Sequence, residues 1–241
     1  MRIALLSDVH ANLVALEAVL AEVGAHDLLW VTGDTVGYGP DPSDVIALLR
    51  ERGAVLVAGN HDLAVATGAG LELFNGYAAA AVRLHHAWLS AEERDRLAAL
   101  PRTLEAEGFT LCHGSLRDPM WEYVMSAPQA LATLRLAATP HCCHGHTHVP
   151  ALFRLAAGAP AAGRAAIETD RAIPLEGRVL LNPGSVGQPR DGDARAAYAV
   201  IDTAGATVTF RRTAYDVGET QRRIRARGLP ELLADRLAVG F

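Results

Sequence analysis

The sequence predicts a two-sheet α/β domain, and three observations support that class. Through the first half of the chain, short apolar runs alternate with amphipathic stretches, which is the rhythm of β-α-β-α units. After Pro101 the segments become short, strand-like and separated by Gly and Pro, which indicates a second and more antiparallel sheet. The 241 residues are 50% hydrophobic, so the chain can bury a sizeable core without disulfides. No repeat or linker interrupts the pattern, and we expect one domain over residues 1–241.

Three continuous apolar runs predict strands in the first half, at residues 2–6, 28–32 and 54–58. Such runs are typical of strands that are covered on both faces, so these three should be central and parallel. Amphipathic stretches at residues 12–23 and 42–52 predict the intervening helices. Asp41 as N-cap and Pro42 at the first helical position mark the start of the second helix, and Gly53 marks its end.

The rest of the chain is predicted to begin with helices and continue with strands. Residues 74–100 predict two helices, the second with a capping box formed by Ser90 and Glu93. Strand-like segments follow at residues 109–114, 141–148, 151–156, 178–184, 196–202 and 206–212. The low-complexity stretch 156–166 should form an exposed hairpin connection, and the tail 216–237 should be helical.

Composition and charge narrow the classes of function. The net charge of −5 disfavours a general nucleic-acid or membrane-surface binder, because phosphate backbones and anionic lipids would be repelled. No stretch approaches the roughly 18 consecutive apolar residues that span a bilayer. The absence of lysine removes Schiff-base and P-loop chemistry. Cys112, Cys142 and Cys143 do not form the pattern of a secreted disulfide framework, so we expect a cytoplasmic protein.

Polar side chains gather where the predicted strands end. Five separate segments carry them, and the residues concerned are Asp8, His10, Asp34, Asn60, His61, His113, His146 and His148. Since the C-terminal ends of strands in α/β sheets meet at one edge, these groups should lie together. His146 and His148 strengthen the pattern, because alternate positions on an extended segment point the same way.

These residue types form a recognisable set of metal ligands. Imidazole and carboxylate groups suit Mn, Fe, Co, Ni or Zn, whereas Mg and Ca prefer an oxygen shell. Without His61, seven of these residues are candidate metal donors, which is more than one ion holds. A carboxylate can bridge two ions that lie roughly 3.5–4 Å apart. We therefore expect two divalent transition-metal ions, with Asp34 as the bridging carboxylate.

Five short motifs occur in order along the chain: Asp8-x-His10, Gly33-Asp34, Gly59-Asn60-His61-Asp62, His113-Gly114 and Gly145-His146-Thr147-His148. In this set and order, the chain resembles the calcineurin-like metallophosphoesterase superfamily. GYGPDP at residues 37–42 and NPGSVGQPRDG at residues 182–192 resemble its small prokaryotic single-domain, phosphodiesterase-like members. The resemblance implies two stacked mixed β-sheets flanked by helices, in a four-layer α/β/β/α sandwich.

Matched position by position, the resemblance also implies the ligand sets. The first metal would take Asp8, His10, Asp34 and His148, and the second would take Asp34, Asn60, His113 and His146. The expected reaction is hydrolysis of a phosphate monoester or diester by a hydroxide that bridges the ions. His61 is the expected general acid for the leaving alkoxide. Tyr38, Ser185 and Arg190 are candidate contacts to a small or nucleotide-like phosphate ester.

One departure from the family pattern concerns His61. The Ser/Thr protein phosphatases of the superfamily follow their Gly-Asp with a phosphate-binding arginine and an acid that orients the histidine. Here residues 35–39 read Thr-Val-Gly-Tyr-Gly, which disfavours protein phosphatase and dinucleoside-tetraphosphatase activity. Either Asp62 or a backbone carbonyl could orient His61 instead.

Two functions of other classes remain alternatives. One is a catalytically silent protein-binding scaffold, because one retromer subunit resembles this fold with an eroded site. The complete ligand set in this chain disfavours it. The other is a nuclease, which the acidic composition disfavours.

Several other polar groups have an ordinary structural interpretation. The His-Cys-Cys-His run at 141–144 has zinc-ligand residue types, but adjacent strand residues point to opposite faces and no second Cys pair exists. His26, His85 and His86 are expected to be surface or packing residues. Six arginines, at positions 211, 212, 222, 223, 225 and 227, indicate a solvated surface more than a nucleic-acid site.

Overall fold

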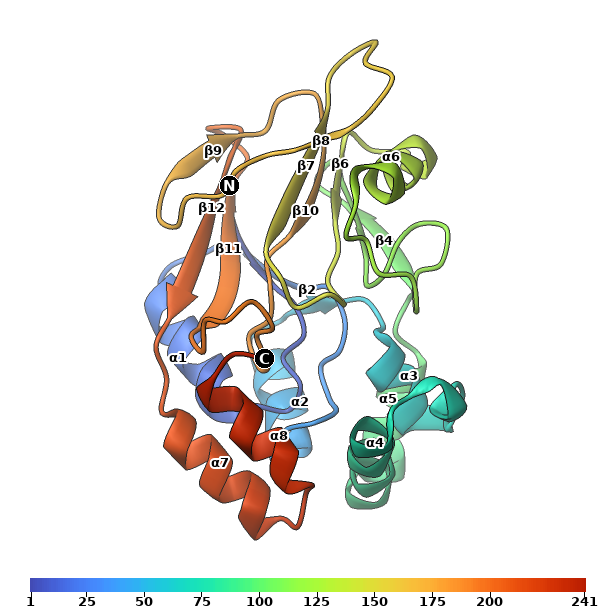
Figure 1. Ribbon diagram of the computed structural model, residues 1–241, viewed down its shortest axis with the longest axis vertical. Helices are drawn as coiled ribbons and strands as arrows, with labels where there is room; N and C mark the ends of the chain where they lie inside the picture. Colours follow the sequence, from blue (N-terminus) through green and yellow to red (C-terminus); the bar gives the residue numbers. More distant parts are fainter.

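A computed structural model describes all 241 residues and contains two six-stranded sheets (Figure 1). The first sheet is formed by β1 (Arg2–Leu6), β2 (Leu28–Val31), β3 (Val55–Leu56), β9 (Ala172–Pro174), β11 (Ala196–Asp202) and β12 (Thr207–Thr213). The second is formed by β4 (Thr103–Ala106), β5 (Phe109–Cys112), β6 (His141–Cys143), β7 (Ala151–Leu155), β8 (Gly163–Arg164) and β10 (Arg178–Asn182). Their strand orders are β3-β2-β1-β11-β12-β9 and β4-β5-β6-β10-β7-β8.

Helices cover the sheets and close one end of the molecule. They are α1 (Leu13–Val23), α2 (Pro42–Glu51), α3 (Asn60–Thr67), α4 (Gly76–Trp88), α5 (Ala91–Ala98), α6 (Ala127–Leu136), α7 (Val217–Ala226) and α8 (Glu231–Asp235), with short 3₁₀ turns η1 (Leu71–Leu73) and η2 (Arg236–Ala238). In Figure 1, α3, α4 and α5 form one group, while α7 and α8 lie on the side of α1. None of the helices has the length and apolarity needed to cross a membrane.

The core consists of layers that follow from the alternation of side chains along each strand. Leu5 of β1 and Leu181 of β10 belong to the apolar cluster between the two sheets. The next residue of β1, Leu6, faces the other way and packs in a cluster with Leu16 of α1. Helix α6 covers the outer face of the second sheet, where Leu180 lies in its cluster. The order of layers is therefore helix, sheet, sheet, helix, as the expected four-layer sandwich requires.

The partners of some strands differ from the expectation. The first three strands are parallel, as predicted, but β3 has only two residues and lies at the edge of the first sheet. The late strands β11 and β12 do not join the second sheet; β11 pairs antiparallel with β1, with Leu5 opposite Ala199. The second sheet has a parallel centre, β5-β6-β10, so it is no more antiparallel than the first. Such pairings join residues far apart in the sequence, which local patterns do not specify.

Local signals predicted the starts of α2 and α5, whereas α3 and α6 were not predicted. Helix α5 begins after Ser90, whose hydroxyl accepts a hydrogen bond from the Glu93 amide at 3.2 Å while the Glu93 carboxylate accepts from the Ser90 amide at 2.8 Å. Helix α2 begins at Pro42, although the Asp41 carboxylate pairs with Arg223 at 3.1 Å and makes no cap hydrogen bond. Residues 156–162 connect β7 to its antiparallel neighbour β8, as expected for a hairpin connection.

Candidate metal centre

The polar residues at the strand ends sit in loops whose backbone turns sharply. Asp8 follows β1 and Asp34 follows β2, with φ angles of 51° and 54°, in the left-handed region that non-glycine residues rarely adopt. His10, His146 and His148 have φ angles of 49°, 67° and 59°. The two loops support each other, because the amide of Asp8 donates to the carbonyl of Gly33 at 3.1 Å and that of His10 donates to Asp34 at 2.9 Å. Such strain is typical of functional sites.

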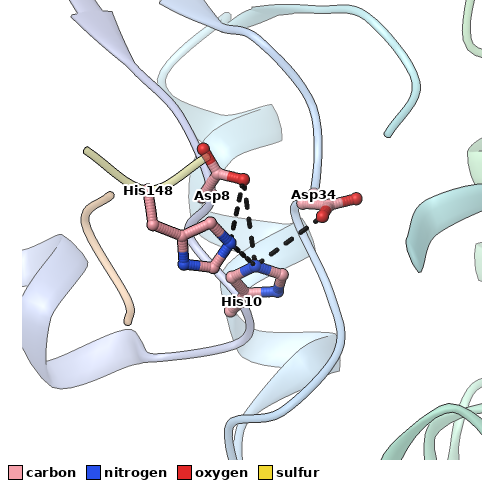
Figure 2. A group of neighbouring side chains, drawn as sticks. All are labelled: Asp8, His10, Asp34 and His148. Atoms are coloured by element: carbon pink, nitrogen blue, oxygen red, sulfur yellow. Dashed lines mark hydrogen bonds and ion pairs between the residues drawn. The ribbon is translucent and has the colours of Figure 1, made fainter. Parts of the chain in front are cut away.

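Asp8, His10, Asp34 and His148 form the first group of donor atoms, all within 4.8 Å of one another and buried (Figure 2). The Nε2 atoms of His10 and His148 lie 3.1 Å apart. An Asp8 carboxylate oxygen is 3.3 Å from Nε2 of His148, and an Asp34 oxygen is 3.6 Å from Nε2 of His10. These are the four residues that the family resemblance implies for the first metal.

Asp34, His113 and His146 form the second group, so Asp34 belongs to both. Its carboxylate oxygen lies 3.2 Å from Nε2 of His113, and that nitrogen lies 3.0 Å from Nδ1 of His146. The side-chain oxygen of Asn60 is 3.1 Å from the same His113 nitrogen. The geometry therefore brings together all four residues expected around the second metal.

Backbone carbonyls fix the tautomer of each of the four histidines. Nδ1 of His10 lies 3.0 Å from the carbonyl oxygen of Val36, and Nδ1 of His113 lies 2.8 Å from that of Thr32. In the same way, the carbonyl oxygen of Gln188 lies 2.5 Å from Nδ1 of His148, and that of Trp121 lies 3.2 Å from Nε2 of His146. A carbonyl only accepts, so each of these nitrogens must carry the hydrogen and donate it. The opposite nitrogen of each neutral ring is left with a lone pair directed into the centre.

This arrangement fits divalent metal ions. His10 faces His148 and His113 faces His146 through nitrogens whose lone pairs point at one another across 3.1 and 3.0 Å. Two lone pairs at such distances repel unless a proton or a cation lies between them. The same places are lined by carboxylate oxygens, so the donor set is nitrogen and oxygen, as transition-metal ions prefer.

The electrostatics distinguish the two carboxylates. Burial raises the pKa of Asp8, since the charged form loses its hydration. Burial acts on Asp34 in the same direction, but His113 and His61 outweigh it when their rings are protonated, through their positive charge and through the hydrogen bond that protonated His113 donates, and the pKa of Asp34 is lowered. Asp34 is therefore the more strongly anionic group, as expected for a carboxylate shared between two cations.

Gly145 permits a close approach between the loops of the two sheets at this centre. A Cβ atom at this position would lie 2.7 Å from a carboxylate oxygen of Asp8 and would overlap the Ser7 hydroxyl. With glycine there, the amide of His146 comes within 3.1 Å of the Asp8 carboxylate and donates to it. The loop after β6 can thus reach the loop after β1.

His146 and His148 reach the centre for a different reason than predicted. The expectation was an extended segment whose alternate side chains point the same way. Both residues instead have positive φ, and the segment is a loop beyond β6. His146 lies in the second group and His148 in the first, so the turns send the two rings to different places.

His61 lies beside the centre at the start of α3. Its amide donates to an Asp34 carboxylate oxygen at 2.9 Å, and its ring packs against His10 with centroids 4.8 Å apart. Burial lowers the pKa of His61 to about 4, an effect that the nearby charge of Asp34 partly opposes. The ring nitrogen Nδ1 is buried without a hydrogen-bond partner.

Neither of the two expected orienting groups holds His61. The Asp62 carboxylate accepts hydrogen bonds from the amides of Val36 at 3.1 Å and Gly59 at 3.0 Å, so it caps α3 and anchors the loop after β2. No carbonyl partners Nδ1 either. Packing positions the ring, with Tyr38 at 4.5 Å and Phe74 at 4.6 Å between centroids.

His85 is a structural residue of this region that the sequence pattern did not distinguish. It is fully buried in α4, and its Nδ1 accepts a hydrogen bond from the amide of Gly37 at 3.0 Å. Its Nε2 donates to the carbonyl of Gly39 at 2.8 Å. The expectation of a packing residue holds, but the ring also fixes the loop against which His61 packs. A helical pattern carries no signal of such a long-range bond.

A cavity of about 130 Å³ opens over the centre. Both Tyr38 and Arg190 line it, as expected for substrate contacts, and a terminal nitrogen of Arg190 lies 3.4 Å from the Tyr38 hydroxyl. Ser185 does not line it. The Ser185 hydroxyl is buried, donates to the carbonyl of Asp8 at 2.8 Å and accepts from the amide of Gln188 at 2.8 Å. This geometry gives Ser185 a role in positioning the Asp8 loop, in place of the substrate contact that the resemblance suggested.

The remaining polar clusters have no comparable arrangement. Cys142 and Cys143 are free, and they pack in clusters on opposite faces of the second sheet. Of the six arginines noted in the sequence, five are paired with acids: Arg211 with Asp170, Arg212 with Asp191, Arg222 with Glu219, Arg223 with Asp41 and Glu219, and Arg225 with Glu231 and Asp235. That neutralisation disfavours the nucleic-acid interpretation.

Comparison with known proteins identifies the family of the chain. The model of the calcineurin-like phosphoesterase superfamily domain matches residues 1–206. The chain therefore belongs to the calcineurin-like phosphoesterase superfamily, a family of metal-dependent phosphoesterases, and its fold is that of the metallophosphoesterase sandwich.

Of three relatives, two cover nearly the whole chain and one matches it only locally. A crystal structure of a metallophosphoesterase from Sphaerobacter thermophilus has 41% sequence identity and a TM-score of 0.89, over 100% of this chain and 99% of that one. An uncharacterized protein from Methanocaldococcus jannaschii is 31% identical over 99% of this chain and 98% of its own. A symmetrical bis(5'-nucleosyl)-tetraphosphatase from Pectobacterium carotovorum is 47% identical over 64 residues, 24% of this chain and 23% of that one.

Proposed function

We propose that this protein hydrolyses phosphate esters with two divalent transition-metal ions. Asp8, His10, Asp34 and His148 would hold one ion, and Asp34, Asn60, His113 and His146 the other. The proposal depends on one observation: the imidazole of His10 faces that of His148, that of His113 faces that of His146, and the carboxylate of Asp34 lies beside both pairs. Two such ions supply hydroxide near neutral pH and neutralise charge on the phosphoryl oxygens.

Residues of the chain around the cavity would bind and protonate the substrate. Arg190 lines the cavity and brings a cation to it, which suits a phosphoryl oxygen. Tyr38, beside it, offers a hydroxyl to the same group. His61 is the general acid for the leaving oxygen. To act as an acid the ring must carry a proton; burial lowers its pKa, whereas the negative charges of Asp34 and of a bound phosphate would favour the protonated form.

The substrate we propose is a small or nucleotide-like phosphate ester in the cytoplasm. The cavity of about 130 Å³ favours a small reacting group, and a relative with local similarity is named as a bis(5'-nucleosyl)-tetraphosphatase. Three buried, unpaired cysteines favour a reducing compartment.

The test begins with metal loading. The metal-stripped protein is incubated with Mn, Ni, Co or Zn, and bound metal is measured by elemental analysis alongside turnover of bis(p-nitrophenyl) phosphate and p-nitrophenyl phosphate. We expect about two bound ions per chain and hydrolysis of at least one of the two esters. Asp34→Asn should lose both the bound metal and the hydrolysis. Metal binding and turnover absent with all four ions would instead favour the protein-binding scaffold.

His61→Asn tests the general acid. The variant should keep its metal but lose roughly 100-fold or more in turnover of esters with poor, alkoxide leaving groups, and much less with p-nitrophenolate, which leaves without a proton. His26→Asn, in the loop between α1 and β2, is the matched control and should behave as wild type. Equal losses for good and poor leaving groups would remove the acid role from His61.

A further inference from the structure

The proposed function fixes where the leaving group of the ester must lie. A general acid has to reach the leaving oxygen, so that part of the substrate lies next to His61. The ring of His61 packs against Tyr38, which contacts Arg190, the proposed partner of the phosphoryl oxygens. It also packs against Phe74, with ring centroids 4.6 Å apart. A leaving group next to His61 therefore comes close to Phe74.

Beyond Phe74 the wall of the cavity is aromatic. The ring of Trp121 meets that of Phe74 edge to face, with centroids 5.3 Å apart, and both residues line the cavity. Tyr123 also lines it and stacks on His146, with centroids 4.0 Å apart and planes 17° apart. One face of the Tyr123 ring is thus covered by His146, while 44% of the residue remains exposed.

The chain holds these rings in place before any substrate arrives. Trp121 and Tyr123 belong to the loop after β5, whose Asp118 carboxylate accepts hydrogen bonds from the amides of Met120 at 3.1 Å and Trp121 at 3.2 Å. The carbonyl of Trp121 accepts from Nε2 of His146 at 3.2 Å. Stacking surfaces that are already ordered lose little conformational entropy when a ligand binds.

The size of the cavity places the organic part of the substrate against this wall. About 130 Å³ corresponds to roughly four water-sized groups, enough for a phosphoryl group but not for a nucleoside as well. The remainder must extend to the mouth, where Leu73 is 62% exposed beside Phe74 and Tyr123 is 44% exposed. Exposed apolar side chains at the rim of a polar site mark a binding surface.

We propose that Phe74, Trp121 and Tyr123 form a subsite for a planar aromatic ring on the leaving group of the ester. This inference rests on the proposed function and specifies its substrate class. An uncharged ring suits the subsite, since none of the three side chains carries charge. A nucleobase and a simple aryl group share this chemistry, and the experiment separates them.

Ligand binding to the manganese-loaded protein tests the subsite. Isothermal titration calorimetry compares benzylphosphonate with cyclohexylmethylphosphonate, which match in charge, length and bulk and differ in the aromatic ring. A stacked ring should bind about 3- to 10-fold more tightly. In parallel, 5'-AMP is compared with ribose 5-phosphate, which lacks the base. Tighter binding of benzylphosphonate without tighter binding of 5'-AMP indicates that the subsite takes a simple aryl group. Tighter binding of 5'-AMP than of ribose 5-phosphate indicates that it takes a nucleobase.

Substitutions then test whether the aromatic residues of the subsite cause the tighter binding of the aromatic ligand. Tyr123→Leu and Trp121→Leu keep apolar bulk but remove the rings, and each should reduce the affinity ratio toward one. Tyr77→Leu is the matched control, because Tyr77 is 52% exposed on α4 but does not line the cavity, and its ratio should stay that of wild type. Equal affinity within both pairs for the wild type would overturn the subsite while leaving the phosphoesterase intact. Loss of binding for all four ligands, together with absent turnover, would count against the proposed function itself.

Discussion

At the scale of single residues, His61 is held in an unusual way for a proposed acid. Its Nδ1 has no hydrogen-bond partner, so ring orientation depends on contacts with neighbouring groups. Gly37 lies beside this ring. A Cβ at Gly37 would lie 2.8 Å from Cγ of His61 and would overlap Nδ1. A side chain at this position would therefore displace the ring.

Gly37→Ala should displace His61. The residue has φ of 93°, so alanine adds backbone strain of about 1–3 kcal/mol as well as the overlap with the ring. A misplaced acid should lower kcat/KM by roughly 100-fold for alkoxide leaving groups, while bound metal is retained. Gly53→Ala is the control, since Gly53 also has positive φ, at 64°, but no atom lies within 4 Å of the added methyl. Equal activity of the two variants, measured with metal content, would contradict the contact.

The grouping of the candidate donor residues could be predicted from the sequence because strand ends in α/β sheets converge, and Asp8, Asp34 and His113 each lie in the loop just beyond a strand. The environment of His61 could not. Its neighbours Gly37, Phe74 and His85 come from three other segments, and nothing local links them. The role of Ser185 was misjudged for the same reason, since motif resemblance does not reveal which way a hydroxyl points.

At the scale of elements, the loop between β2 and α2 links the centre to α4. His85 of α4 bonds to the amide of Gly37 and the carbonyl of Gly39, and Asp62 of α3 bonds to the amide of Val36. Both helices thus hold the same loop. Caps and helix starts such as Ser90 and Pro42 are local signals, so the sequence predicted these boundaries. The edge position of β3 and the pairing of β11 with β1 depend on distant partners and were missed.

His85→Gln should change how stability depends on pH. Burial lowers the pKa of His85 to about 3, an effect to which the charges of His61 and Arg227 add and which the bond to Gly39 opposes. The unfolded chain binds this proton near pH 6.5, whereas the folded protein does not until about pH 3. The contribution of the neutral His85 ring to the free energy of unfolding is therefore complete above pH 6.5 and is lost as the pH falls toward 3.

The variant lacks this titration, so between pH 4 and 6 its unfolding free energy should fall less steeply than that of wild type. The difference in slope should approach about 1.4 kcal/mol per pH unit. At pH 7 the variant should be about 1–3 kcal/mol less stable, because two buried backbone groups lose their partner. His86→Gln, at the exposed neighbouring position, is the control. Urea unfolding at several pH values measures both quantities, and identical slopes for His85→Gln and wild type would contradict the buried neutral ring.

At the scale of the whole molecule, the centre joins the two sheets. Asp8 and Asp34 follow strands of the first sheet, whereas His113 follows β5 and His146 lies beyond β6 of the second. Below the centre, the shared apolar cluster contains residues of both sheets, Leu5 and Leu181 among them. Separation of the sheets would expose this cluster and break both donor groups together. We infer that residues 1–241 unfold as one unit, as expected for a single domain.

Metal binding should therefore stabilise the entire chain and not one part of it. A ligand that binds only the folded state adds about 2.7 kcal/mol for each site at a free concentration 100 times its Kd. For a domain of this size, that corresponds to a rise in Tm of roughly 5–10 °C per site. Calorimetry with and without manganese should give one transition that moves as a whole, with the far-UV and near-UV circular dichroism midpoints in agreement. In Asp34→Asn the shift should largely vanish, because both donor groups lose their shared carboxylate. Two resolved transitions, of which manganese moves only one, would show that the sheets unfold separately and that the centre does not tie them together.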